Sequence, residues 1–184
     1  MQYHNAGSGL NKLFIAQIGT VISSVLLLIP LINLIALIAI LGFLVLSLIG
    51  LNEAGRDIGG CKTAFQLTVA ELMLNILSGL LGDGILETLV SAASSVAGFL
   101  ALYFVCSSVA EVLRTLSYND IASRGELVWK INLACYAVEI IMSFLSLVPH
   151  LNILAAPAGI MTSVVSVIAG ILYIMFLYKS ANAL

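Results

Sequence analysis

Six long apolar segments, separated by short breaks, constrain this chain more than any other feature of its sequence. They cover residues 12–29, 33–54, 62–81, 85–113, 126–148 and 152–179. A helix needs about 20 mostly apolar residues, with a range of about 17–25, to cross the hydrocarbon core of a bilayer. The sequence therefore predicts an all-α integral membrane protein, a single polytopic domain over residues 1–184 with six transmembrane helices.

The composition makes lipid the expected solvent for such a fold. Of the 184 residues, 61% are hydrophobic and 9% are charged, whereas soluble domains are about 45–50% apolar and about 25% charged. The net charge of −2 comes without a basic block, so nucleic acid is not an expected partner. The three cysteines are scattered and the two histidines lack ligand-like spacing, so we expect no metal site and no cofactor.

The basic residues predict the orientation of the chain. In the six-helix prediction all seven fall on one side of the membrane: Lys12, Arg56, Lys62, Arg114, Arg124, Lys130 and Lys179. Lysine and arginine are enriched in cytoplasmic loops. We therefore expect both termini and the charged breaks at 52–60 and 114–125 to be cytoplasmic. With compact loops, no cleavable signal sequence and no glycosylation acceptor in an outer turn, the expected location is a bacterial cytoplasmic membrane.

The six helices also read as three tandem hairpins, at residues 10–55, 60–115 and 125–183. Aligning Lys12, Lys62 and Lys130 places an outer turn eighteen to twenty residues further on in each copy, at Pro30, Leu80 and His150, and LIPLINLIA (28–36) resembles LVPHLNILA (147–155). Internal repeats of this kind are common in transporters. The alternative is that hairpins rich in Leu and Ile resemble one another through composition alone.

Two glutamates stand inside apolar segments, Glu71 and Glu139, each nine residues after its aligned lysine. Helical spacing places polar residues on the same face as each acid. This candidate intramembrane site comprises Glu71, Thr68, Asn75 and Ser78 on one helix and Glu139, Asn132, Tyr136, Ser143 and Ser146 on another. A thinner, uncharged stripe on the first helix holds Gln17, Thr20 and Ser24.

A carboxylate at the centre of a bilayer costs roughly 2.5–3.5 kcal/mol on insertion scales, so such residues face a bundle interior or a wet cavity. No lysine or arginine is expected at the depth of these acids. Each glutamate is then either protonated or in contact with a cation, a proton or water. The functional hypothesis is a transporter or channel-like protein that exchanges protons or binds a cation. The alternative is that both glutamates only join helices through hydrogen bonds.

Small residues form a second pattern, on the fourth and sixth helices. The candidate packing faces are Ser91, Ser94 and Gly98, and Gly159, Ser163, Ser166 and Gly170. Small faces let helix backbones approach closely in a membrane, within a chain or between chains. They support an alternative function as a non-transporting membrane subunit or scaffold, assembled as a homo-oligomer or with a membrane partner.

Enzyme motifs are absent from the sequence: it has no G-x-S-x-G elbow, phosphate loop, H-E-x-x-H pair or dinucleotide fingerprint. We expect no enzyme. In length, helix number and cytoplasmic termini, the chain is similar in outline to the substrate-binding subunits of energy-coupling-factor vitamin transporters. That resemblance implies a vitamin-binding subunit as a further alternative. The A-x-x-x-A docking faces of that family are missing from LFIAQIGTVISS (13–24) and AFQLTVAELM (64–73), and no site residue carries over.

Overall fold

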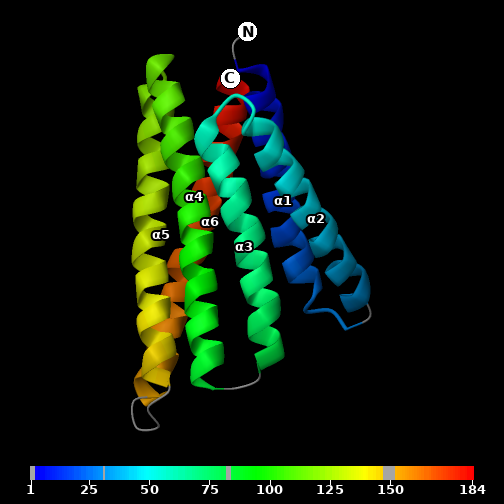
Figure 1. The fold of residues 1–184 in the computed structure, drawn as a ribbon, viewed down its shortest axis with the longest axis vertical. Helices are drawn as coiled ribbons and strands as arrows, with labels where there is room; N and C mark the ends of the chain where they lie inside the picture. Colours follow the sequence, from blue (N-terminus) through cyan, green and yellow to red (C-terminus); the bar gives the residue numbers. More distant parts are fainter. Residues whose placement is uncertain (1–2, 31, 82–83, 147–151) are drawn as a thin grey trace.

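The computed structural model describes residues 3–30, 32–81, 84–146 and 152–184, without the side chains of residues 143–163. The described residues form six helices and no strand (Figure 1). The helices are α1 (His4–Leu26), α2 (Asn33–Ala54), α3 (Gly59–Leu81), α4 (Ile85–Thr115), α5 (Asn119–Ser146) and α6 (Asn152–Ala183). The predicted all-α class is confirmed.

Five of these helices are long and apolar enough to cross a membrane: α1 to α4, and α6 over Val164–Ala183. The described part of α5 is not among them, and it carries charged residues at intervals from Asp120 to Glu139. The structure therefore supports a membrane protein, while the sixth span stays a prediction.

Three helices begin earlier than the apolar segments predict: α1 at His4, α3 at Gly59 and α5 at Asn119. The prediction followed apolar residues alone, but polar residues at a membrane surface also form helix. The break predicted at 114–125 is consequently short. It is a Schellman turn in which Ser117 has a φ of 67° and the Tyr118 N–H donates to the Leu113 carbonyl at 2.8 Å.

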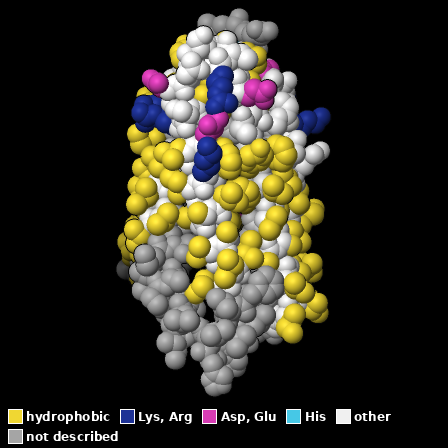
Figure 2. All heavy atoms as spheres, turned by 90° about the vertical axis from the view of Figure 1, so that its left-hand side faces the viewer, with side chains coloured by type: hydrophobic (Ala, Val, Ile, Leu, Met, Phe, Trp, Pro, Cys, Tyr) yellow, Lys and Arg dark blue, Asp and Glu magenta, His cyan; other side chains and the backbone are white. Residues whose placement is uncertain are grey.

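The helices form a ring in which each packs against its neighbours in the sequence and α6 closes on α1. The α2 helix packs far more on α1 than on α3. Both termini and the α2–α3 and α4–α5 connections lie at one end of the bundle, which we call the charged end (Figure 1). Figure 2 shows Lys, Arg, Asp and Glu side chains near this end, above a broad hydrophobic surface.

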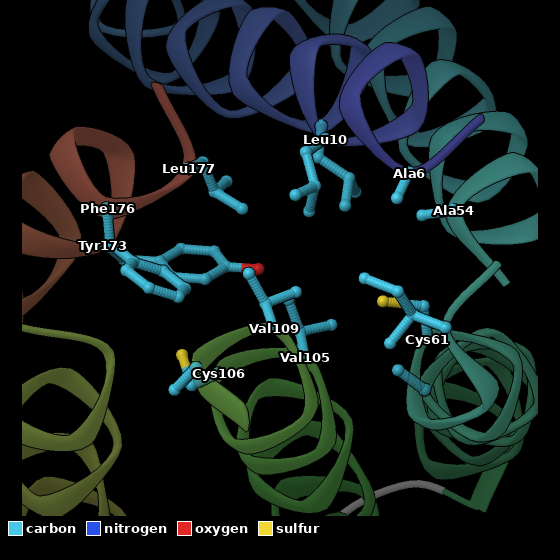
Figure 3. Close-up of a cluster of buried hydrophobic side chains, with 14 of the residues drawn as sticks. Ala6, Leu10, Ala54, Cys61, Val105, Cys106, Val109, Tyr173, Phe176 and Leu177 are labelled. Atoms are coloured by element: carbon cyan, nitrogen blue, oxygen red, sulfur yellow. The ribbon is translucent and has the colours of Figure 1, made fainter. Parts of the chain in front are cut away.

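A buried apolar core fills the half of the bundle next to the charged end. Every helix contributes to it, and the side chains meet at the centre (Figure 3). Each helix places at least one side chain in the core that is at most 4% exposed. In the order of the helices, examples are Leu10, Leu51, Cys61, Val109, Val128 and Phe176. This core fixes the helix ends that carry the charged residues.

Polar contacts tie the chain together at the charged end. Lys12 of α1 pairs with Glu53 of α2, and Arg114 of α4 pairs with Glu126 of α5. Asp57, in the α2–α3 connection, accepts hydrogen bonds from the Asn5 side chain at 3.0 Å and from the Ala6 N–H at 2.9 Å. It therefore caps the N-terminal turn of α1. The Asn5 hydrogen bond, with smaller contributions from backbone N–H groups, lowers the pKa of Asp57 below 3.8.

Candidate functional site

A cavity of about 300 Å³ lies at the inner edge of the core and is lined by residues from all six helices. Leu13, Leu51, Val105 and Tyr173 belong to the core and to the cavity wall. The other lining residues are Gln17, Ser47, Thr68, Glu71, Gly98, Ala101, Leu102, Asn132, Tyr136, Ser166 and Gly170. The ring of helices therefore surrounds a partly open space that is lined by both apolar and polar side chains.

Among the described residues that line this cavity, Glu71 is the one that can carry a charge near neutral pH. Its carboxylate lies over Gly98 of α4: a Cβ atom at position 98 would fall 2.7 Å from Oε1 and 2.9 Å from Cδ. Glycine at position 98 therefore leaves the room that the carboxylate occupies. The sequence predicted Gly98 as a helix-packing residue; in the structure, its missing side chain leaves space for the Glu71 carboxylate.

No hydrogen bond or ion pair to the Glu71 carboxylate is formed within the described part of the chain. In that same part, every fully buried side-chain nitrogen or oxygen has a hydrogen-bond partner. The carboxylate oxygens, which have none, are therefore open to the cavity. The basic residues lie at the charged end, where Lys12, Arg114 and Lys130 have glutamate partners of their own.

Two neutral residues that line the same cavity, Thr68 and Asn132, carry acceptor atoms. Thr68 Oγ1 donates its proton to the Ala64 carbonyl at 2.9 Å. Asn132 Nδ2 donates to the Val128 carbonyl at 2.9 Å. The Thr68 hydroxyl proton and one of the two Asn132 amide protons are used on the residue's own helix, which leaves the Thr68 oxygen lone pairs, Asn132 Oδ1 and the second Asn132 N–H for a ligand. Together with Glu71 they make an acceptor-rich wall.

The structure separates the predicted polar stripe of α3 into two parts. Thr68 and Glu71 line the cavity, whereas Asn75 and Ser78 contact α4. Ser94 Oγ lies 2.7 Å from Asn75 Oδ1 and 3.2 Å from the Glu71 carbonyl oxygen. Ser78 Oγ donates to Glu87 Oε1 at 3.1 Å. This second part of the stripe joins α3 to α4.

On α5 the predicted stripe divides as well. Asn132 and Tyr136 line the cavity. Glu139, one turn further along, is exposed and does not line it, and its side chain takes part in other interactions. The side chains of Ser143 and Ser146 lie outside the described residues. The two glutamates that the sequence paired are therefore in different surroundings.

Some of the predicted small residues pack against a neighbouring helix, and others line the cavity. Ser94 is buried against α3, and Ser91 is half-buried. Ser166 and Gly170 line the cavity, and a Cβ atom at Gly170 would meet nothing within 4 Å. The side chains at Gly159 and Ser163 lie outside the described residues. Gly170 therefore leaves space in the cavity wall.

Sequence reasoning did not assign Ser47 or Tyr173 to a site. Ser47 is the only hydroxyl residue of α2 and stands in an apolar run, a signal that could have identified it. Tyr173 is 9% exposed, and its hydroxyl points toward the centre of the bundle (Figure 3). Gln17, on the weak stripe of the first helix, also lines the cavity.

The described residues hold no group of three His, Cys, Asp or Glu side chains that could bind a metal ion. No protein-family model, curated protein or solved structure matches the chain. A functional interpretation must therefore come from the chemistry of the cavity.

Proposed function

We propose that this chain is a small multi-pass transporter or channel-like protein of a bacterial cytoplasmic membrane. In this proposal all six helices span the bilayer and the charged end faces the cytoplasm. The proposal is supported by the five helices that are long and apolar enough to span a membrane, and by the Lys and Arg side chains near the charged end (Figure 2). Lysine and arginine near helix ends favour the cytoplasmic side.

Glu71 is the residue that would carry the function, by exchanging a proton or binding a cation. The observation behind this proposal is a carboxylate that opens on a cavity lined by six helices and has no basic partner among the described residues. An intramembrane carboxylate is costly, and the cost is reduced when it faces a polar cavity and a cation. Thr68, Asn132 and Tyr136 would supply neutral contacts to the same ligand.

Flux measurements on proteoliposomes test this role. We expect Glu71→Gln to abolish proton- or cation-coupled flux, because glutamine keeps the shape of the side chain and loses its charge. The matched control is Glu87→Gln, which removes a carboxylate that contacts Ser78 away from the cavity, and it should retain flux. Glu139→Gln should reduce flux less than Glu71→Gln, since Glu139 is not part of the cavity wall. Undiminished flux in Glu71→Gln would refute the proposal.

A non-transporting subunit or scaffold is the alternative proposal. It would use the small residues of α4 and α6 to contact a second copy or a membrane partner. Ser94 already packs against α3 within the chain, so a partner would have to bind the remaining exposed surface. Substituting Ser91→Leu should then disrupt a copurifying complex while flux is unaffected.

A vitamin-binding subunit is the third proposal. Its support is the cavity, whose volume of about 300 Å³ is at the lower end of the range for small-molecule pockets, about 300–1,000 Å³. A vitamin retained through purification, and identified by mass spectrometry, would favour it.

A further inference from the structure

The cavity differs from a bare-ion site in size and in ligand set. Metal ions of the Mg²⁺ or Ca²⁺ type take about six to eight oxygen ligands within roughly 2.0–2.6 Å. Here the lining has one carboxylate, and the described residues hold no cluster of acidic or histidine side chains. The volume of about 300 Å³ is also roughly ten times the share of one water molecule in the liquid. The cavity is therefore large enough for a small organic molecule.

The charge and the hydrogen-bonding groups of the lining define the polar end of such a molecule. Glu71 brings a negative charge, and none of the described residues that line the cavity is a lysine, arginine or histidine. Thr68 uses its hydroxyl proton and Asn132 one of its two amide protons on their own helices, and both keep acceptor oxygens for a ligand. A group with several N–H donors and a positive charge matches all three residues. A primary ammonium carries three donors and no acceptor.

The opposite side of the cavity defines the rest of the molecule. Leu13, Leu51, Ala101, Leu102 and Val105 present an apolar surface continuous with the buried core. These five side chains are apolar, and Tyr173 adds an aromatic ring with one hydroxyl, so this part of the lining suits an apolar or aromatic body. Cavities of this type bind ligands by a large apolar contact and a few placed polar groups.

We propose that the cavity binds a small organic ammonium ion, with its N–H groups on Glu71, Thr68 and Asn132 and its apolar body against Leu13, Leu51 and Val105. This inference rests on the proposed function, that the cavity binds a cation. It adds that the cation is organic and amphiphilic, and that the cavity discriminates against Na⁺, K⁺ and neutral molecules of the same shape.

Calorimetric titration of the full chain in nanodiscs tests this inference with defined probes. Benzylammonium carries the expected charge and an aromatic group. Benzyl alcohol has a similar shape without the charge, and Na⁺, K⁺ and Mg²⁺ carry charge without an apolar group. We expect saturable binding of benzylammonium to the unaltered protein at neutral pH, and at least tenfold weaker binding of the other probes. Glu71→Gln should weaken benzylammonium by roughly 10- to 100-fold, the loss of one charge-assisted hydrogen bond.

A pair of glycine substitutions separates cavity filling from general disturbance. A Cβ atom at Gly170 or at Gly42 meets nothing within 4 Å, but only Gly170 lines the cavity. Gly170→Leu should therefore abolish benzylammonium binding, whereas Gly42→Leu should leave it unchanged. If Gly170→Leu does not fold, Gly170→Ala is the smaller substitution and should weaken binding.

The outcomes distinguish the two levels of the proposal. Glu71-dependent binding or flux of Na⁺, K⁺ or protons, with no benzylammonium binding, would overturn the organic ammonium and leave the proposed function standing. Equal binding of benzyl alcohol and benzylammonium would also overturn it, since charge would then play no part. If Glu71→Gln alters neither binding nor flux of any cation, both proposals fail.

Discussion

The two halves of the bundle are held together in different ways. Next to the charged end, large apolar side chains from every helix are buried together, with Phe176, Leu10 and Val109 fully inaccessible. Among the described residues of the other half, the buried side chains are small or hydroxylated: Ser23, Ala36, Thr88 and Ser94. Large apolar residues there face outward, such as Leu28 at 81% and Leu80 at 79% exposed.

This difference follows from the solvent. Lipid is as apolar as leucine, so burial of an apolar side chain between helices gains little from solvent transfer, and packing and polar contacts decide association. The charged half gains from close packing and from its cap and ion pairs. The other half relies on hydrogen bonds between α3 and α4. The cavity lies where the apolar core ends. Core residues therefore line the cavity on the side of the charged end, next to Glu71.

The largest effect is expected from breaking the close helix contact in the charged half. A Cβ atom at Gly9 of α1 would fall 2.5 Å from the Gly50 carbonyl oxygen and 2.5 Å from the Ala54 nitrogen, both backbone atoms of α2. Gly9→Ala should therefore force the two helices apart and lower the free energy of unfolding by about 1–3 kcal/mol. Denaturant unfolding in mixed micelles measures this change.

The control for Gly9→Ala is Gly42→Ala on α2, where a Cβ atom meets nothing within 4 Å. Its free energy of unfolding should be unchanged or slightly higher, since alanine is the better helix former. Equal stability of Gly9→Ala and Gly42→Ala would show that the close approach of α1 and α2 does not stabilise the charged half.

A smaller effect, with a pH dependence, is expected at Asp57. Its hydrogen bonds to Asn5 and Ala6 lower its folded pKa below 3.8. A lowered folded pKa gives stability that is fully present above the unfolded pKa and is lost as the pH falls through the folded pKa. Asp57→Ala should cost about 0.5–2 kcal/mol near neutral pH, the range for a helix cap, and the difference from the unaltered protein should vanish in acid. The free energy of unfolding of both proteins should be measured from neutral to acidic pH. A difference between them that does not change with pH would contradict the role of Asp57 as a cap.

The sequence predicted the helices well because long apolar segments and turn residues are local features. The predicted bounds of 33–54 agree with α2, and those of 85–113 end two residues before α4 does. The starts of α1 and α5 were missed, because polar interfacial residues carry no apolar signal. Helical spacing placed Thr68 beside Glu71, but it could not show which neighbours in α4 would receive Asn75 and Ser78. It also could not show that Glu71 and Glu139 differ in surroundings, since that depends on how each helix is rotated in the ring.

The smallest effect is expected from the polar contact that joins α3 and α4 in the other half. Ser94 is 3% exposed and its Oγ lies 2.7 Å from Asn75 Oδ1. Hydrogen bonds between membrane helices average about 0.6 kcal/mol, so Ser94→Ala should lower the free energy of unfolding by about that amount. Ser24→Ala is the control, since Ser24 is exposed and bonds only to the Thr20 carbonyl of its own helix. A loss for Ser94→Ala as large as that for Gly9→Ala would contradict the comparison, because the other half would then depend on its contacts as strongly as the charged half does.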